Sequence, residues 1–215
     1  MSKSGLVFKM GSGLSLIGKQ TFISSSGIGS GEISGLKEIE SQLERIKVKY
    51  PRKKSAIMPA LYIAQEYFGF VSKEAIAWVS GQLDLPPAHV ESVATFYTMY
   101  YKRPVGRYHI QVCRTLSCML CGAKELTSYL KDRLRVGAGE PTKDGLWSWE
   151  EVECLGSCGT APMVEINDVF FENLTPELLG KTMDLIEKEK PDLRFHAGSG
   201  TLGSGLPDHS RSQVI

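Results

Sequence analysis

The chain has 215 residues, a length that suits one ordinary domain or two small ones. Its 25 basic and 24 acidic side chains nearly balance and no long basic block occurs, so we expect no nucleic-acid-binding surface. No apolar run approaches the roughly 18 residues that a membrane span needs, so we expect no direct membrane span.

Residues 1–35 are rich in serine and glycine and have no apolar core of the kind found in signal peptides. They carry lysines and no acid before Glu32, which weakly resembles an organelle transit peptide. Such peptides are Arg-rich, however, and the first arginine here is Arg45. We therefore expect a disordered leader on a protein of a reducing compartment. The glycines do not complete G-x-G-x-x-G, so the leader predicts no dinucleotide fold.

Residues 36–100 are predicted to form a small bundle of amphipathic helices. Leu36, Ile39 and Leu43 recur every three or four positions among charged residues, which is typical of one helix face, and Pro51 is expected to stop this helix. The favoured interpretation is that these helices form a hydrophobic core and have no catalytic or metal-binding role. Further helices are predicted over about 55–68, from a cap at Ser72 to near Gly81, and from Pro86-Pro87 to about Val93.

Residues 101–190 show a different pattern, β-α-β-β-α. In "GRYHIQVC", apolar Tyr108, Ile110 and Val112 alternate with His109 and Gln111, which predicts a strand with one buried face. The other expected elements are a helix over about 123–136, a strand in "LWSWEEVEC", two short strands in "PMVEINDVFFENL" and a helix over about 175–188. We expect a flexible tail over 191–215, which is Gly/Ser-rich from Gly198.

All five cysteines of the chain fall in "CRTLSCMLCG" and "VECLGSCGTAPM". Cys113 closes the first predicted strand and Cys154 the second, while Cys118 and Cys158 lie in the loops that follow. Because the ends of adjacent strands are close in space, we expect these two pairs to converge at one edge of the sheet. Cys121 is expected in the first turn of the helix that begins "CGAKELTSYL".

Three interpretations of these thiols are open. A [2Fe-2S] cluster needs four thiolates, and C-x4-C with C-x3-C would supply two from each loop. Thiol–disulfide exchange at the C-x-x-C of Cys118 and Cys121 would leave Cys113, Cys154 and Cys158 without a role. Structural zinc also accepts four cysteine thiolates. Five cysteines so close together are unusual for merely buried small side chains.

If the cysteines bind a cluster, a second set of four ligands is possible. Cys113, Cys118 and Cys121 spell C-x4-C-x2-C, which begins the ligand run of plant-type ferredoxins. We disfavour it because it would leave one of Cys154 and Cys158 unused, although their loop is flanked by glycines whose backbone N–H groups can point at sulfur. It would also use Cys121, whose side chain can turn away from the loop.

The stretches "TFYTMYYKRPVGRYHIQVCRTLSCMLCGAKEL" and "VECLGSCGTAPMVEINDVFFENLTPE" resemble a known family. This family is the 24 kDa subunit of respiratory complex I (NADH-quinone oxidoreductase) and its bacterial equivalents. The resemblance covers about residues 36–187 and includes whole phrases as well as cysteine spacing. It implies an α+β fold, with an N-terminal helical bundle followed by a thioredoxin-like [2Fe-2S] ferredoxin domain.

The resemblance also implies roles. It assigns the cluster ligands to Cys113, Cys118, Cys154 and Cys158 and gives Cys121 no role. It implies single-electron exchange with FMN on a partner subunit that binds NADH, docking through the helical segment, and further peripheral-arm subunits of complex I as partners. The chain alone is not expected to oxidise NADH.

The expected location is the cytoplasmic side of the inner membrane through the complex, or the mitochondrial matrix in a eukaryote. Equivalent subunits occur in NAD-dependent formate dehydrogenases and bifurcating hydrogenases, and a zinc-stapled interaction module is an alternative of a different class.

Overall fold

The structure, a computed structural model, describes residues 30–203 of the chain. Most of the expected leader and the last part of the expected tail lie outside these residues. The chain divides into two compact units, with the boundary between Tyr100 and Tyr101.

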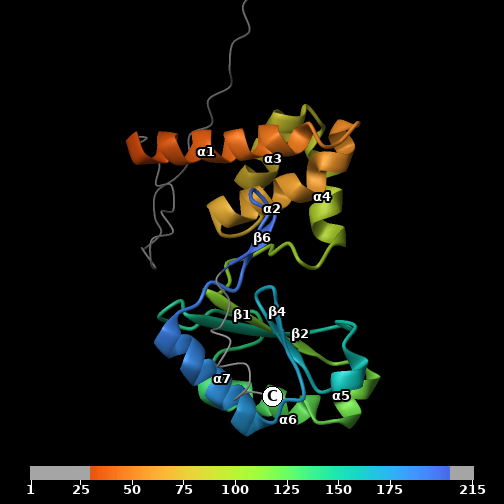
Figure 1. The fold of residues 1–215 in the computed structure, drawn as a ribbon, viewed down its shortest axis with the longest axis vertical. Coiled ribbons are helices and arrows are strands. Elements are labelled where there is room, and N and C mark those ends of the chain that lie inside the picture. Colours follow the sequence, from red (N-terminus) through yellow and green to blue (C-terminus); the bar gives the residue numbers. More distant parts are fainter. Residues whose placement is uncertain (1–29, 204–215) are drawn as a thin grey trace, which may run out of the picture. The chain divides into compact units, whose positions relative to one another are not determined.

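The described part of the first unit is built from helices (Figure 1). They are α1 (Ser30–Lys47), the short 3-10 helix η1 (Lys53–Ala56), α2 (Ile57–Phe68), α3 (Lys73–Leu83) and α4 (Pro87–Phe96). The helical periodicity predicted for the first segment is confirmed, because Ile39, Leu43 and Ile46 are buried. α1 begins at Ser30, so the end of the expected leader is helical, and it ends at Lys47, before Pro51.

Residues at the helix ends explain where the helices begin and end. Gly69 terminates α2 in the left-handed conformation, with φ of 81°. The Ser72 hydroxyl caps α3 by accepting a hydrogen bond from the Ala75 N–H at 3.2 Å. Pro87 occupies the first position of α4, where its missing N–H has no helical partner to lose.

The second unit contains a four-stranded mixed sheet in the order β2-β1-β3-β4. The strands are β1 (Tyr108–Cys113), β2 (Trp147–Val152), β3 (Val164–Ile166) and β4 (Val169–Phe171). β1 runs parallel to β2 and antiparallel to β3, so the first two strands end at the same edge. The predicted β-α-β-β-α order and the α+β class are confirmed, with α6 (Ala123–Leu134) and α7 (Pro176–Glu189) as its helices.

Both long helices cover one face of this sheet (Figure 1). Tyr108, Ile110 and Val112 of β1 point to that face and pack in a core with side chains from α6 and α7. The helices contribute Leu126 and Leu130 from α6, and Leu179, Met183 and Ile186 from α7. Each of these side chains is almost completely removed from water, which is the main stabilising term for the unit.

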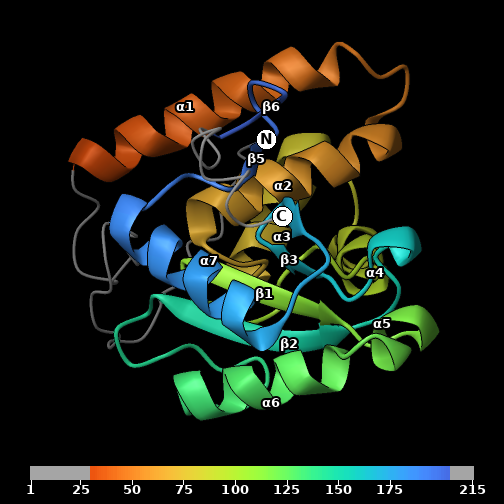
Figure 2. The same ribbon diagram turned by 60° about the horizontal axis from the view of Figure 1, so that its bottom comes forward.

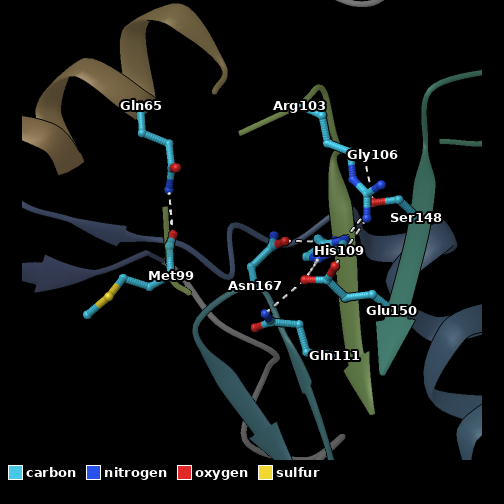
Figure 3. Close-up of polar contacts among 9 residues, drawn as sticks. All are labelled: Gln65, Met99, Arg103, Gly106, His109, Gln111, Ser148, Glu150 and Asn167. Carbon is cyan, nitrogen blue, oxygen red and sulfur yellow. Dashed lines mark hydrogen bonds and ion pairs between the residues drawn. The ribbon is translucent and has the colours of Figure 1, made fainter. Parts of the chain in front are cut away.

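The opposite face of β1 is also buried, so the expectation of one buried face was wrong. His109 is buried, and its two ring nitrogens lie 2.7 Å from Ser148 Oγ and 3.1 Å from Glu150 Oε1 (Figure 3). Gln111 Nε2 donates to the same Glu150 oxygen at 3.4 Å. The Tyr101 ring lies edge-on to His109, with centroids 5.0 Å apart. Polar side chains tolerate burial here because they are hydrogen-bonded to one another.

A short helix and a small hairpin of the second unit were not predicted. α5 (Leu116–Leu120) is a five-residue helix between β1 and α6, and β5 (Phe195–His196) pairs with β6 (Thr201–Leu202) as a small antiparallel hairpin. The hairpin lies within the expected tail. None of the helices in residues 30–203 is both long and apolar enough to span a membrane.

Candidate metal centre

Four of the five cysteines lie around one edge of the sheet. Cys113 is the last residue of β1, and Cys118 lies in α5, which follows at the end of that strand (Figure 2). Cys154 follows β2, and Cys158 opens the 3-10 helix η2 (Cys158–Thr160). Cys113 is in register with Val152, the last residue of β2, so the loops after the two parallel strands leave the sheet side by side.

Backbone hydrogen bonds tie these loops to each other. The Arg114 N–H donates to the Val152 carbonyl at 3.0 Å, and the Cys113 N–H donates to the Met163 carbonyl at 3.4 Å. The segment after the second cysteine pair therefore returns alongside the first pair before it enters β3. This contact confirms the expected convergence of the two loops at one edge.

The first pair, Cys113 and Cys118, is buried. Burial raises the pKa of Cys113, but hydrogen bonds from the backbone at Thr115 and Leu155 outweigh it and lower the pKa overall. Leu155 belongs to the second loop, so one loop contributes to the environment of the other loop's sulfur. Burial, together with the hydrogen bond and the charge of Cys113, raises the pKa of Cys118 to about 11.

The second pair, Cys154 and Cys158, is exposed, and its sulfur atoms lie 3.7 Å apart. The Gly156 N–H donates to Cys154 Sγ at 3.4 Å. Gly156 has φ of +89°, a left-handed conformation that only glycine adopts without strain. The hydrogen bond and the charge of Cys154 raise the pKa of Cys158.

The two pairs also influence each other. The charge of Cys158 contributes to raising the pKa of Cys118, and the hydroxyl of Ser117 hydrogen-bonds to Cys158 from the first loop. Within residues 30–203, no three His, Cys, Asp or Glu side chains are grouped so that they could hold one metal ion. The four thiols lie as two pairs, with Cys113 hydrogen-bonded to Cys118 in one loop and Cys154 close to Cys158 in the other.

Cys121 is placed differently from the expectation, which put it in the first turn of the long helix. It is the C-cap of α5, and its N–H donates to the Ser117 carbonyl at 3.0 Å. Gly122, with φ of +113°, then separates it from α6. The expectation was wrong because a separate short helix, α5, precedes α6, and Cys121 ends α5 instead of beginning α6. The Cys121 side chain is exposed, whereas Cys118, its C-x-x-C neighbour, is buried.

A hydroxyl and carboxylate network supports the second loop. Ser157 Oγ and Thr160 Oγ1 lie 2.8 Å apart, and both hydroxyls donate to Glu172 Oε1, at 2.6 Å from Thr160. Glu172 was not singled out in the sequence analysis. It lies directly after β4, and no local spacing in the sequence connects it to the cysteines.

The rim of the site carries exposed apolar side chains. Leu116, Met119 and Leu120 of α5 expose 71%, 45% and 78% of their surface. They lie on both sides of the buried Cys118 in the sequence. Exposed large apolar side chains gathered on one short helix are typical of a protein interaction surface.

Known proteins resemble this chain over most of its length. The sequence profile of a family described as thioredoxin-like [2Fe-2S] ferredoxin matches residues 43–187. An NADH-quinone oxidoreductase subunit of Rickettsia bellii is 42% identical over 152 residues, which cover 69% of this chain and 91% of that protein. NADH-quinone oxidoreductase subunit 2 of Thermus thermophilus is 47% identical over 128 residues, covering 59% and 71%.

Among solved structures, the chain is similar to an NAD+-reducing [NiFe]-hydrogenase crystallised in the H2-reduced state. The TM-score is 0.54 and the identity 20%, over 66% of this chain. The chain spans about a quarter of that hydrogenase chain, 24% of its length. At this identity the similarity shows a shared fold alone.

Proposed function

Because the chain belongs to the thioredoxin-like [2Fe-2S] ferredoxin family, we propose that it is the [2Fe-2S] electron-carrier subunit of an NADH:quinone oxidoreductase, respiratory complex I. The observation that carries this proposal is the meeting of two cysteine pairs at one sheet edge. We propose Cys113, Cys118, Cys154 and Cys158 as the four ligands.

The donor set fits such a cluster. A [2Fe-2S] centre takes four cysteine thiolates, two on each iron, and this chain supplies two thiols from each of two adjoining loops. Backbone N–H groups also point at sulfur, as at Gly156. Such hydrogen bonds stabilise thiolate charge and tune the reduction potential of a bound cluster.

The protein's own residues have distinct parts in this proposal. The burial of Cys113 and Cys118 keeps water from one side of the site, while the exposure of Cys154 and Cys158 leaves the other side open. When bound, the cluster supplies a centre that takes up and releases one electron at a time. Leu116 and Leu120 are exposed on α5, the helix that carries Cys118, and we propose that an electron-transfer partner docks there.

We infer that the partner is the subunit that binds NADH and FMN. Hydride carries two electrons, a [2Fe-2S] centre accepts one, and a flavin mediates between the two. Relatives at 42% and 47% identity carry the name NADH-quinone oxidoreductase, which favours complex I over a hydrogenase whose similarity is limited to the fold. We place the chain with other peripheral-arm subunits on the cytoplasmic side of the inner membrane, or in the matrix if it is mitochondrial.

Metal and sulfide analysis of anaerobically purified protein tests the cluster. We expect two iron and two sulfide per chain, and an S = 1/2 EPR signal after reduction with dithionite. Stoichiometric zinc without sulfide would establish the zinc-stapled module instead.

Co-expression with the matching flavin subunit tests whether the partner, and not this chain, oxidises NADH. The complex should reduce ferricyanide with NADH, whereas this chain alone should not. NADH oxidation by the chain without a flavoprotein would refute the assignment of that step to the partner.

A further inference from the structure

We propose that Glu172 is a positioning residue for the cysteine centre. Its carboxylate clamps the loop that carries Cys154 and Cys158, and it places a fixed negative charge beside the bound cluster. The clamp rests on contacts within the chain, and the effect of the charge rests on the proposed function.

The clamp consists of two hydroxyl donors on one carboxylate oxygen. Ser157 directly precedes Cys158, and Thr160 ends the 3-10 turn that Cys158 begins. Both donate to Glu172 Oε1, and they also contact each other at 2.8 Å. Thr160 Oγ1 lies 3.2 Å from the Ser157 carbonyl as well, so the turn around Cys158 is closed on itself and fastened to Glu172.

The backbone after Glu172 continues the attachment. The Asn173 N–H donates to the Thr160 carbonyl at 2.8 Å, and the Leu174 N–H donates to the Pro162 carbonyl at 3.0 Å. Leu174 is 3% exposed and packs in the core of the unit. The second cysteine loop is therefore hydrogen-bonded to a segment that packs in the core through Leu174.

The second loop needs such support. Cys154, Gly156, Cys158 and Gly159 are all exposed, so little apolar burial holds this stretch in place. Ordering an irregular loop costs backbone entropy at every residue, and glycine loses the most. Charge-assisted hydrogen bonds to a carboxylate are stronger than neutral ones and offset part of this cost.

The charge of Glu172 has a second consequence. Hydrogen bonds from Ser157 and Thr160 lower the pKa of the Glu172 carboxyl, so it is ionised at neutral pH. Reduction of the cluster adds one electron and breaks no bond. A fixed anion nearby disfavours that added negative charge and lowers the reduction potential.

Hydrogen exchange on the cluster-free protein tests the clamp. Glu172→Ala removes the acceptor, and we expect about tenfold faster amide exchange over residues 156–160, which corresponds to about 1.4 kcal/mol of local stability. Glu172→Gln keeps an oxygen acceptor but loses its charge, so its exchange should be slower than that of Glu172→Ala and somewhat faster than that of wild type. Asp132→Asn, an exposed acid near the end of α6 far along the helix from the cysteine edge, is the matched control and should change nothing.

A redox titration of the cluster-loaded protein, followed by EPR, tests the charge. Glu172→Gln should keep full cluster content and shift the midpoint potential upward, whereas Asp132→Asn, with the same change in charge, should leave it in place. Glu172→Ala should also lose its cluster faster to an iron chelator than Glu172→Gln does. A role in structure alone would not separate the potential of the glutamine variant from that of the control.

Unchanged exchange in Glu172→Ala would overturn the clamp, and an unchanged potential in Glu172→Gln would overturn the effect of the charge. If Glu172→Ala does not fold, the double variant Ser157→Ala/Thr160→Val removes the same hydrogen bonds and must show the faster exchange. If wild-type protein takes up no iron and sulfide, the proposed function fails, while the exchange measurements still decide the clamp.

Discussion

Cys154 Sγ lies 3.7 Å from Cys158 Sγ in a loop that is open to solvent. Cys113 and Cys118, which hydrogen-bond to each other in the adjoining loop, are buried. The two pairs thus differ in access to water, although they lie at the same edge of the sheet. A cluster held by both pairs would be shielded on one side and reachable from the other.

Serine substitution tests the ligand assignment. We expect Cys113→Ser, Cys118→Ser, Cys154→Ser and Cys158→Ser each to lose the cluster or to shift its EPR spectrum, because a serine oxygen is a harder ligand than thiolate. Cys121→Ser should keep both iron content and line shape, since Cys121 is exposed at the end of α5. Iron analysis and EPR on the five variants provide the measurement.

The plant-type ferredoxin assignment predicts a different result for this series. Under that assignment Cys121→Ser would abolish the cluster, and either Cys154→Ser or Cys158→Ser would have no effect. This pattern would replace our ligand set while leaving the presence of a cluster intact.

The apolar rim of α5 gives a prediction about the partner. Leu116→Ser combined with Leu120→Ser should weaken binding to the flavin subunit by about tenfold or more, as expected when an interface loses a residue worth over about 1 kcal/mol. Both side chains are largely exposed, so the fold and cluster content should be unaffected. Leu202→Ser, which changes an exposed leucine in β6, is the control, and binding can be measured by calorimetry. Equal affinity of the double variant and wild type would place the interface elsewhere.

β1 could be predicted from the sequence, whereas α5 could not. The alternation in "GRYHIQVC" has the strand period of two, so it correctly predicted the strand and the position of Cys113 at its end. α5 has only five residues, too few to show a helical period, and Cys121 was therefore assigned to the next helix. Burial of the polar face depends on partners such as Ser148 and Glu150, which lie about forty positions away in sequence.

The cysteine pairs could be grouped from the sequence because both follow predicted strands, and strand ends converge. Glu172 could not be found in this way. Its contact with Ser157 depends on how β3 and β4 turn back after the second loop, a tertiary relationship that leaves no spacing pattern.

Two glycine substitutions should change stability in opposite directions. A Cβ at Gly106 would lie 2.3 Å from the backbone carbon of Trp147 in β2, and backbone cannot move aside easily. We expect Gly106→Ala to cost roughly 1–3 kcal/mol. Gly81 lies in α3, where an added Cβ would meet nothing within 4 Å apart from its chain neighbours and the backbone of its own helix, so Gly81→Ala should stabilise by roughly 0.5–1 kcal/mol. Denaturant unfolding measures both, and a neutral Gly106→Ala would contradict the close packing of residue 106 on β2.

The last prediction concerns Glu165 in β3, which is paired with Gln111 on the buried polar face. Burial, with a contribution from the charge of Asp168, raises the pKa of Glu165 from 4.5 to about 7. The folded protein therefore holds a proton that the unfolded chain releases between about pH 4.5 and 7, so the free energy of unfolding falls as pH rises through this window. Glu165→Gln mimics the protonated form and should remove this loss, which makes the variant more stable than wild type by roughly 1–3 kcal/mol at pH 8 and nearly equal to it at pH 4.5. Denaturant unfolding from pH 4.5 to 8 is the measurement, with Asp132→Asn as the exposed control. A difference between Glu165→Gln and wild type that stays constant over this range would mean that Glu165 does not titrate near neutrality.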